Sequence, residues 1–120
     1  MITQQTITAT VATGATGATA DTSFIDGEIL KVAMDVTGDS MDINLDSLGE
    51  QKAQAIIDYT GNTDSTFYPR TPAEDHTGTD VTYDGTNEIY TPFVVYGTLR
   101  LTLASAAAAE TVTMTITYRT

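Results

Sequence analysis

The chain has no cysteine and no tryptophan, and only one histidine and three prolines, among its 120 residues. Without cysteine, structural disulfides, thiolate metal sites and thiol nucleophiles are all excluded. A single histidine without cysteine also leaves no familiar ligand spacing for zinc. Aromatic residues make up 8% of the chain. We therefore expect a core built mainly from aliphatic side chains.

Long apolar runs are also missing. No stretch approaches the roughly 20 residues that a membrane-spanning helix needs. The first residues contain no basic segment followed by an apolar one, so they do not resemble a secretory signal. We therefore expect a soluble protein that is made in a cytoplasm.

Positive charge is scarce: 16 acidic residues stand against five lysines and arginines, and the net charge is −11. Binding to a phosphate backbone needs clustered lysine and arginine, so nucleic acid is not an expected partner. An anionic membrane surface would repel this chain for the same reason. The simplest interpretation is that the charge keeps the protein soluble at high local density.

What the chain has in abundance is a two-residue alternation of apolar residues with threonine. Along residues 111–118 every second side chain is apolar, and residues 6–11 repeat the pattern. Side chains alternate between the two faces of a strand, and threonine suits a solvated sheet face. The apolar members are Val112, Met114, Ile116 and Tyr118 near the C-terminus, and Ile7, Ala9 and Val11 near the N-terminus.

The same alternation predicts further strands. Residues 30–36 and 41–45 alternate on either side of a turn at 37–40, which predicts a hairpin. Ser47 and Glu50 have the spacing of a helix capping box, but Gly49 favours a bend that leads into a strand over 55–60. A strand over 93–103 contains Gly97, which indicates a bulge or bend.

Together these patterns predict one all-β domain over residues 1–120, with little helix. The simplest arrangement is an antiparallel β-sandwich of about six to eight strands. Residues 1–24 would form an extended arm or an edge strand. Residues 61–92 form a long polar region, which is either a functional loop or holds minor strands at 81–83 and 88–90.

Few side chains indicate chemistry. His76 lies in a polar turn and is interpreted as a solvated loop residue. Aspartates at 35, 39, 42 and 46 lack the order of an EF-hand loop, although an ordered cation there stays open. A pair of carboxylates from distant strands also stays open, but no phosphate-binding glycine motif is present. We expect no catalytic residue, metal or cofactor.

Arginine and aromatic residues favour protein contacts, because both are the usual anchors of interfaces. The predicted contact patch comprises Phe67, Tyr68, Pro69, Arg70 and Arg100. In so acidic a chain, the alternative for each arginine is an ion pair within the protein or between subunits.

Three blocks in order resemble small structural proteins of tailed bacteriophages, which are regarded as capsid decoration or cement proteins. The blocks are residues 25–32, the segment Thr66-Phe67-Tyr68-Pro69-Arg70 and residues 93–103, and the alternating strand 111–118 follows them. The resemblance implies a jelly-roll-like β-sandwich on the outside of the virion capsid, made in the host bacterial cytoplasm. It implies binding to the major capsid protein and to copies of itself, as dimers or trimers, and no catalytic residues.

Two other classes stay open. One is another virion component, such as a head-fibre base, a tail module or a baseplate module. The other is a carbohydrate-binding β-sandwich, for which Tyr83, Tyr90 and Tyr96 could serve as platforms. An enzyme is not expected.

Overall fold

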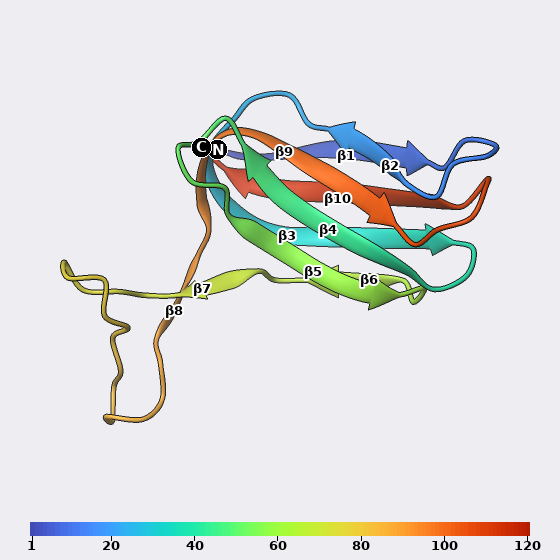
Figure 1. The fold of residues 1–120 in the computed structure, drawn as a ribbon. Coiled ribbons are helices and arrows are strands. Elements are labelled where there is room, and N and C mark those ends of the chain that lie inside the picture. The colour runs from blue at the N-terminus through green and yellow to red at the C-terminus, as the bar shows by residue number, and fades with distance from the viewer.

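The computed structural model describes residues 1–120, and every regular element in it is a β-strand. The strands pack antiparallel in two layers (Figure 1). A narrow segment of residues 70–92, called the arm from here on, projects from one end of these layers. The all-β antiparallel sandwich predicted from the sequence is confirmed. The strands are β1 (Ile2–Thr10), β2 (Ala18–Asp21), β3 (Ile25–Thr37), β4 (Met41–Leu48), β5 (Ala55–Gly61), β6 (Ser65–Phe67), β7 (Arg70–Pro72), β8 (Tyr90–Pro92), β9 (Val94–Ala104) and β10 (Thr111–Arg119).

Eight of these strands form the sandwich. Sheet I has the order β1-β10-β3-β6, and sheet II has the order β2-β9-β4-β5. The pairs are nested: β1 pairs with β10, β2 with β9, β3 with β6 and β4 with β5. Nested pairing of this kind arises when one long hairpin folds over itself, so the architecture is jelly-roll-like.

The core lies between the two sheets and is almost wholly aliphatic. Val112, Met114 and Ile116 are buried, while the threonines between 111 and 115 stay at the surface, as the alternation predicted. Ile43 and Leu45 of β4 meet them from the opposite sheet. Burying one such side chain fully contributes about 1.5–3 kcal/mol, so this core is the main source of stability.

The two sheets join at one corner, where strand β9 changes partners. Residues 94–97 pair with the start of β3 in sheet I, and residues 98–104 pair with β4 in sheet II. Gly97 stands at this change with φ of +154°. A Cβ atom at Gly97 would lie 2.4 Å from the carbonyl oxygen of Leu48. The bend predicted at Gly97 is therefore present, and only glycine fits it without strain.

The hairpin predicted from residues 30–36 and 41–45 is wrong. Strand β3 pairs with β10, β9 and β6, whereas β4 pairs with β5 and β9. The connection at 38–40 instead carries the chain from one sheet to the other. Both strands have one apolar face, and these faces meet across the core rather than side by side in one sheet. Alternation shows which face of a strand is buried, but it does not identify the partner strand.

A buried carboxylate fixes the end of the sandwich opposite the arm. The side chain of Glu110 accepts hydrogen bonds from the main-chain N–H groups of Asp39 and Ala107. It therefore ties the connection between β3 and β4 to the connection between β9 and β10. At the other end, the segment after Ser47 is a bend, as predicted, and Ser47 Oγ accepts the N–H of Gln54 at 2.8 Å.

The structure contains no helix with the length and apolar character needed to cross a membrane.

Candidate docking surface

The predicted contact patch does not form one surface. Tyr68 is exposed beside the base of the arm. Its neighbours pack inward: Pro69 is buried, and the ring of Phe67 lies 5.8 Å from the ring of Tyr59. Of this segment, only Tyr68 and Arg70 therefore present side chains to the outside.

Both predicted arginines are engaged within the chain. The guanidinium of Arg70 donates hydrogen bonds to the carbonyl oxygens of Pro69, at 2.7 Å, and Leu30, at 3.4 Å. Arg100 lies on sheet II, where its Nε and one terminal nitrogen bind the two carboxylate oxygens of Asp21 at 2.8 and 3.0 Å. This pairing lowers the pKa of Asp21. The alternative of an internal ion pair is thus the one found for Arg100.

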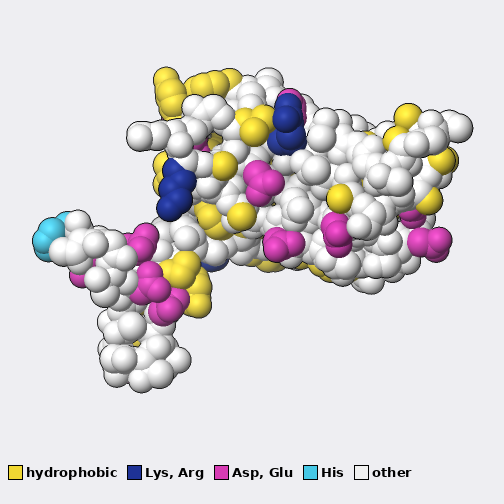
Figure 2. All heavy atoms as spheres, viewed as in Figure 1, with side chains coloured by type: hydrophobic (Ala, Val, Ile, Leu, Met, Phe, Trp, Pro, Cys, Tyr) yellow, Lys and Arg dark blue, Asp and Glu magenta, His cyan; other side chains and the backbone are white.

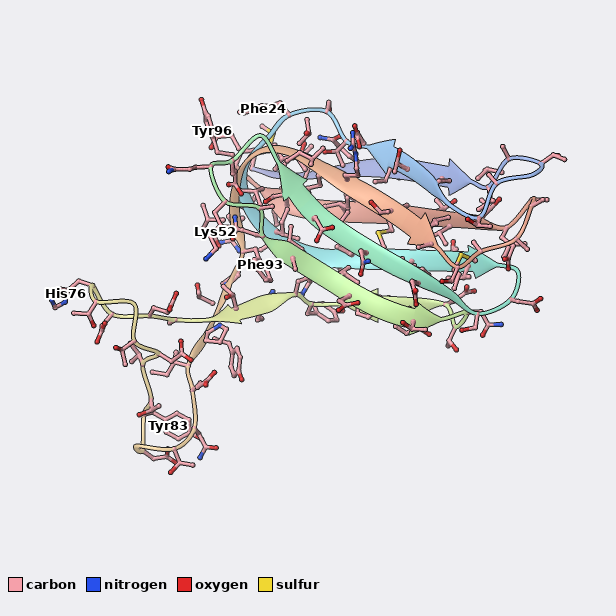
Figure 3. The ribbon with its side chains drawn as sticks, viewed as in Figure 1. Phe24, Lys52, His76, Tyr83, Phe93 and Tyr96 are labelled. Carbon is pink, nitrogen blue, oxygen red and sulfur yellow. The ribbon has the colours of Figure 1, made fainter.

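The candidates for metal and acid–base chemistry lie apart. Asp35 belongs to sheet I, and Asp42 and Asp46 belong to sheet II, because the predicted hairpin does not form. No group of three or more histidine or acidic side chains is arranged to hold a metal ion. His76 is exposed at a tip of the arm (Figure 3).

The arm comprises residues 70–92 and stands on a two-stranded stem formed by β7 and β8. Beyond the stem, three main-chain hydrogen bonds close a ring. The N–H of Ala73 donates to the carbonyl oxygen of Ile89 at 2.7 Å, and the N–H of Ile89 donates to that of Val81 at 3.1 Å. The N–H of Val81 in turn donates to the carbonyl oxygen of Ala73 at 2.8 Å. These residues are spaced eight apart, and the stem and two short hairpins radiate from the ring they form.

Each hairpin of the arm is closed by an aspartate. Asp75 accepts hydrogen bonds from the N–H groups of Thr77 and Thr79 and from the hydroxyl of Thr77. Asp84 accepts the N–H groups of Thr86 and Asn87. These bonds favour the ionised form and lower the pKa of both carboxyls, chiefly through the hydroxyl of Thr77 and the N–H of Asn87.

The arm is ordered by hydrogen bonds and not by a core. No residue from 70 to 94 is buried. Where minor strands were predicted, at 81–83 and 88–90, the structure has a single isolated bridge between Thr82 and Glu88. The ring that joins the stem to the two hairpins was not predicted, although the apolar residues at 73, 81 and 89 within a polar segment were a signal of it. A segment that projects without packing on its own body is suited to contact another molecule.

Exposed apolar side chains gather on the arm and on the end of the sandwich that carries it, here called the arm end. All nine large ones lie there, and the connections at the opposite end have none. They are Met1, Ile2, Phe24, Tyr68, Tyr83, Ile89, Tyr90, Val94 and Tyr96. Such one-sided clustering marks interaction surfaces, since single exposed apolar residues are otherwise scattered.

The body of the arm end is held in place by local contacts. The rings of Phe24 and Tyr96 meet edge to face with centroids 4.8 Å apart (Figure 3). Glu50 accepts the N–H of Tyr96 at 3.2 Å, and the side-chain amide of Gln54 donates to the carbonyl of Val94 at 2.9 Å. The side-chain amide of Gln54 also lowers the pKa of Glu50.

A hollow of about 600 Å³ separates this body from the base of the arm. Lys52 and Phe93 face it, together with the carboxylates of Glu50 and Glu74 (Figure 3).

Negative charge dominates the arm. The chain has no lysine or arginine between Arg70 and Arg100, so every charged side chain of the arm beyond Arg70 at its base is acidic (Figure 2). Its acidic residues are Glu74, Asp75, Asp80, Asp84 and Glu88. Sheet II is acidic as well, and burial followed by the nearby charge of Asp58 raises the pKa of Asp46.

No family model, no curated protein and no solved structure matches the chain.

Proposed function

We propose that the protein is a virion structural protein, a decoration or cement protein that binds the outside of an icosahedral phage head and bridges major capsid subunits. The observation that carries the proposal is the collection of every large exposed apolar side chain on the arm and the arm end. The phage-like blocks of sequence support the same assignment.

The geometry suits a bridge between two neighbouring subunits. The arm end offers a firm aromatic surface at Phe24 and Tyr96, and the arm extends the reach of the molecule, whose longest dimension is 49 Å. One subunit of the shell would meet the body and the next would meet the arm. Many copies that bind only the assembled shell stabilise it together by mass action.

The proposal is tested with heads of the phage that encodes the chain. Residues 73–89 are replaced by two glycines between Pro72 and Tyr90, which keeps the stem. Cosedimentation with expanded heads should show a loss of binding of at least about tenfold, because the deletion removes the exposed Tyr83 and Ile89 and with them the proposed contact to the second subunit. Thr102→Ala on the outer face of sheet II serves as the control and should bind normally.

The melting temperature of the shortened chain should stay close to that of the wild type, since none of the removed residues is buried. Unchanged binding by this folded variant, or virions that carry no copies on the shell, would overturn the proposal. A cryo-electron map with copies on the tail or baseplate would favour another virion component instead.

A carbohydrate-binding sandwich is the second candidate. Tyr83, Tyr90 and Tyr96 are exposed by 70%, 59% and 66%, so each could stack on a sugar ring. They lie on a tip of the arm, on its stem and on the body, and do not form one platform. Saturable binding on a glycan array, lost in Tyr83→Ala, would favour this candidate over the first.

A further inference from the structure

The four edge strands of the sandwich differ in how they are protected. An exposed edge presents unpaired N–H and C=O groups, and proteins protect such edges with short strands, charge or proline. Strand β6 has three residues and β2 has four. Strand β5 has seven residues and carries Asp58.

Strand β1 has none of these protections. It is nine residues long, it pairs with β10 without any shift of register, and β10 is the only strand it pairs with. The first charged side chain of the sequence is Asp21, and no proline precedes it. In a chain with 16 acidic residues, β1 is therefore an edge without charge.

The surroundings of β1 are largely neutral too, apart from Arg119, which pairs with Ile2 at one end of the strand. The outward faces of β1 and β10 carry rows of threonines whose hydroxyls bond across the strands, as between Thr6 and Thr115 and between Thr8 and Thr113, both at 3.0 Å. On the neighbouring β2, Asp21 is neutralised by Arg100. Repulsion between two copies of this acidic chain is therefore weakest along this side.

We propose that the partner of this edge is the β1 strand of a second copy, paired antiparallel about a two-fold axis. The two sheets I would then continue as one sheet through the dimer. The register that pairs all nine residues of β1 places Thr6 opposite Thr6 of the second copy. In this register outward side chains meet outward side chains, so both threonine faces join. The inference does not depend on the proposed function.

The test is the mass of the full chain in solution, measured by sedimentation velocity over a range of concentrations. The wild type should reach twice the 12.7 kDa of one chain. Thr6→Lys and Thr6→Glu should each weaken the dimer by about tenfold or more, because like charges would meet at the axis. The exposed Thr66 lies on the other edge of sheet I, so Thr66→Lys should leave the dimer unchanged.

A mixture of the Thr6→Lys and Thr6→Glu proteins should recover a dimer, since opposite charges then meet. If only the net charge mattered, the two variants would change the dimer affinity in opposite directions, because Thr6→Lys reduces the negative charge of the chain and Thr6→Glu increases it. In the wild type, the outward amides of β1 should exchange hydrogen more slowly as the dimer forms. A chain that stays monomeric up to about 1 mM would overturn the proposal. A dimer that both Thr6 variants leave intact, or one that protects the amides of the arm and not those of β1, would also overturn it.

Discussion

Gly97 is the residue on which the junction of the two sheets depends. Its φ of +154° is a conformation that other residues rarely adopt, and its Cα faces the carbonyl of Leu48. A side chain there would push β9 away from β4 at the point where β9 changes sheets. The close approach of these two strands explains why a glycine interrupts strand β9, whose inward-facing residues are otherwise aliphatic.

We expect Gly97→Ala to lower the free energy of unfolding by about 2–4 kcal/mol, from backbone strain together with the clash at Leu48. Urea denaturation followed by circular dichroism measures the change. Gly14→Ala is the matched control, because Gly14 also has a positive φ, of +82°, but a Cβ there has no atom within 4 Å. Equal losses in the two variants would show that the contact with Leu48 does not matter.

At the scale of the element, the tips of the arm depend on ionised aspartates. A carboxyl whose pKa is lower in the folded chain than in the unfolded chain stabilises the folded form. This stabilisation is fully present at a pH above the unfolded pKa, and it is lost as the pH falls through the lowered pKa. The pKa of Asp75 and that of Asp84 are both lowered. Both tips should therefore keep their structure above the usual carboxyl pKa of about 3.9 and lose it only below that value.

Amide chemical shifts of Thr77 and Thr79, followed from pH 6 downward, measure this transition at the first tip. In Asp75→Asn the side-chain oxygen still accepts hydrogen bonds but no longer titrates, so these shifts should lose their pH dependence. The amides of Thr86 and Asn87 should titrate as before, because they bind Asp84. A midpoint above the usual carboxyl value at either tip would contradict the prediction.

The elements also show how far the sequence predicts this structure. Alternation identified the strands and their buried faces, as for Val112 and Met114, because the period of side chains along a strand is fixed. It could not show that β3 and β4 lie in different sheets, since pairing is settled by packing between distant segments. The arm was less visible still, because main-chain hydrogen bonds among Ala73, Val81 and Ile89 leave little trace in the side chains.

The candidate docking surface was also predicted only in part from the sequence. The sequence indicated Tyr68 and Arg70 near the surface that the structure favours. It gave no sign that Phe24 would be exposed, because Phe24 is an apolar residue directly before strand β3 and resembles a core position. Arg100 was grouped with the patch by residue type alone, and its place on sheet II follows only from the fold.

For the whole molecule, the net charge of −11 should make stability depend on salt. Raising the NaCl concentration from about 0.01 M to 0.15 M shortens the screening length from about 30 to 8 Å. We expect the melting temperature to rise by about 4 °C, because repulsion within the folded chain is relieved. At Asp46, burial is the main reason for the raised pKa, and salt relieves only the smaller part that comes from repulsion by Asp58.

Differential scanning calorimetry at pH 7 measures this change. Near pH 4.1, where the net charge approaches zero, the effect of salt should be much smaller. A melting temperature that falls with salt at pH 7 would show that attractive pairs such as Asp21 and Arg100 outweigh the repulsion.

The nested pairing of the strands also sets the order in which the molecule is completed during synthesis. Strand β10 lies between β1 and β3. When β1 and β3 leave the ribosome, the segment that must fill the gap between them has not yet been translated. The apolar faces of β1 and β3 stay exposed to water until residues 111–119 emerge, and strands so distant in sequence pair slowly. The nascent chain therefore remains unfolded until then, and its hydroxyl-rich, negatively charged composition opposes aggregation during this interval.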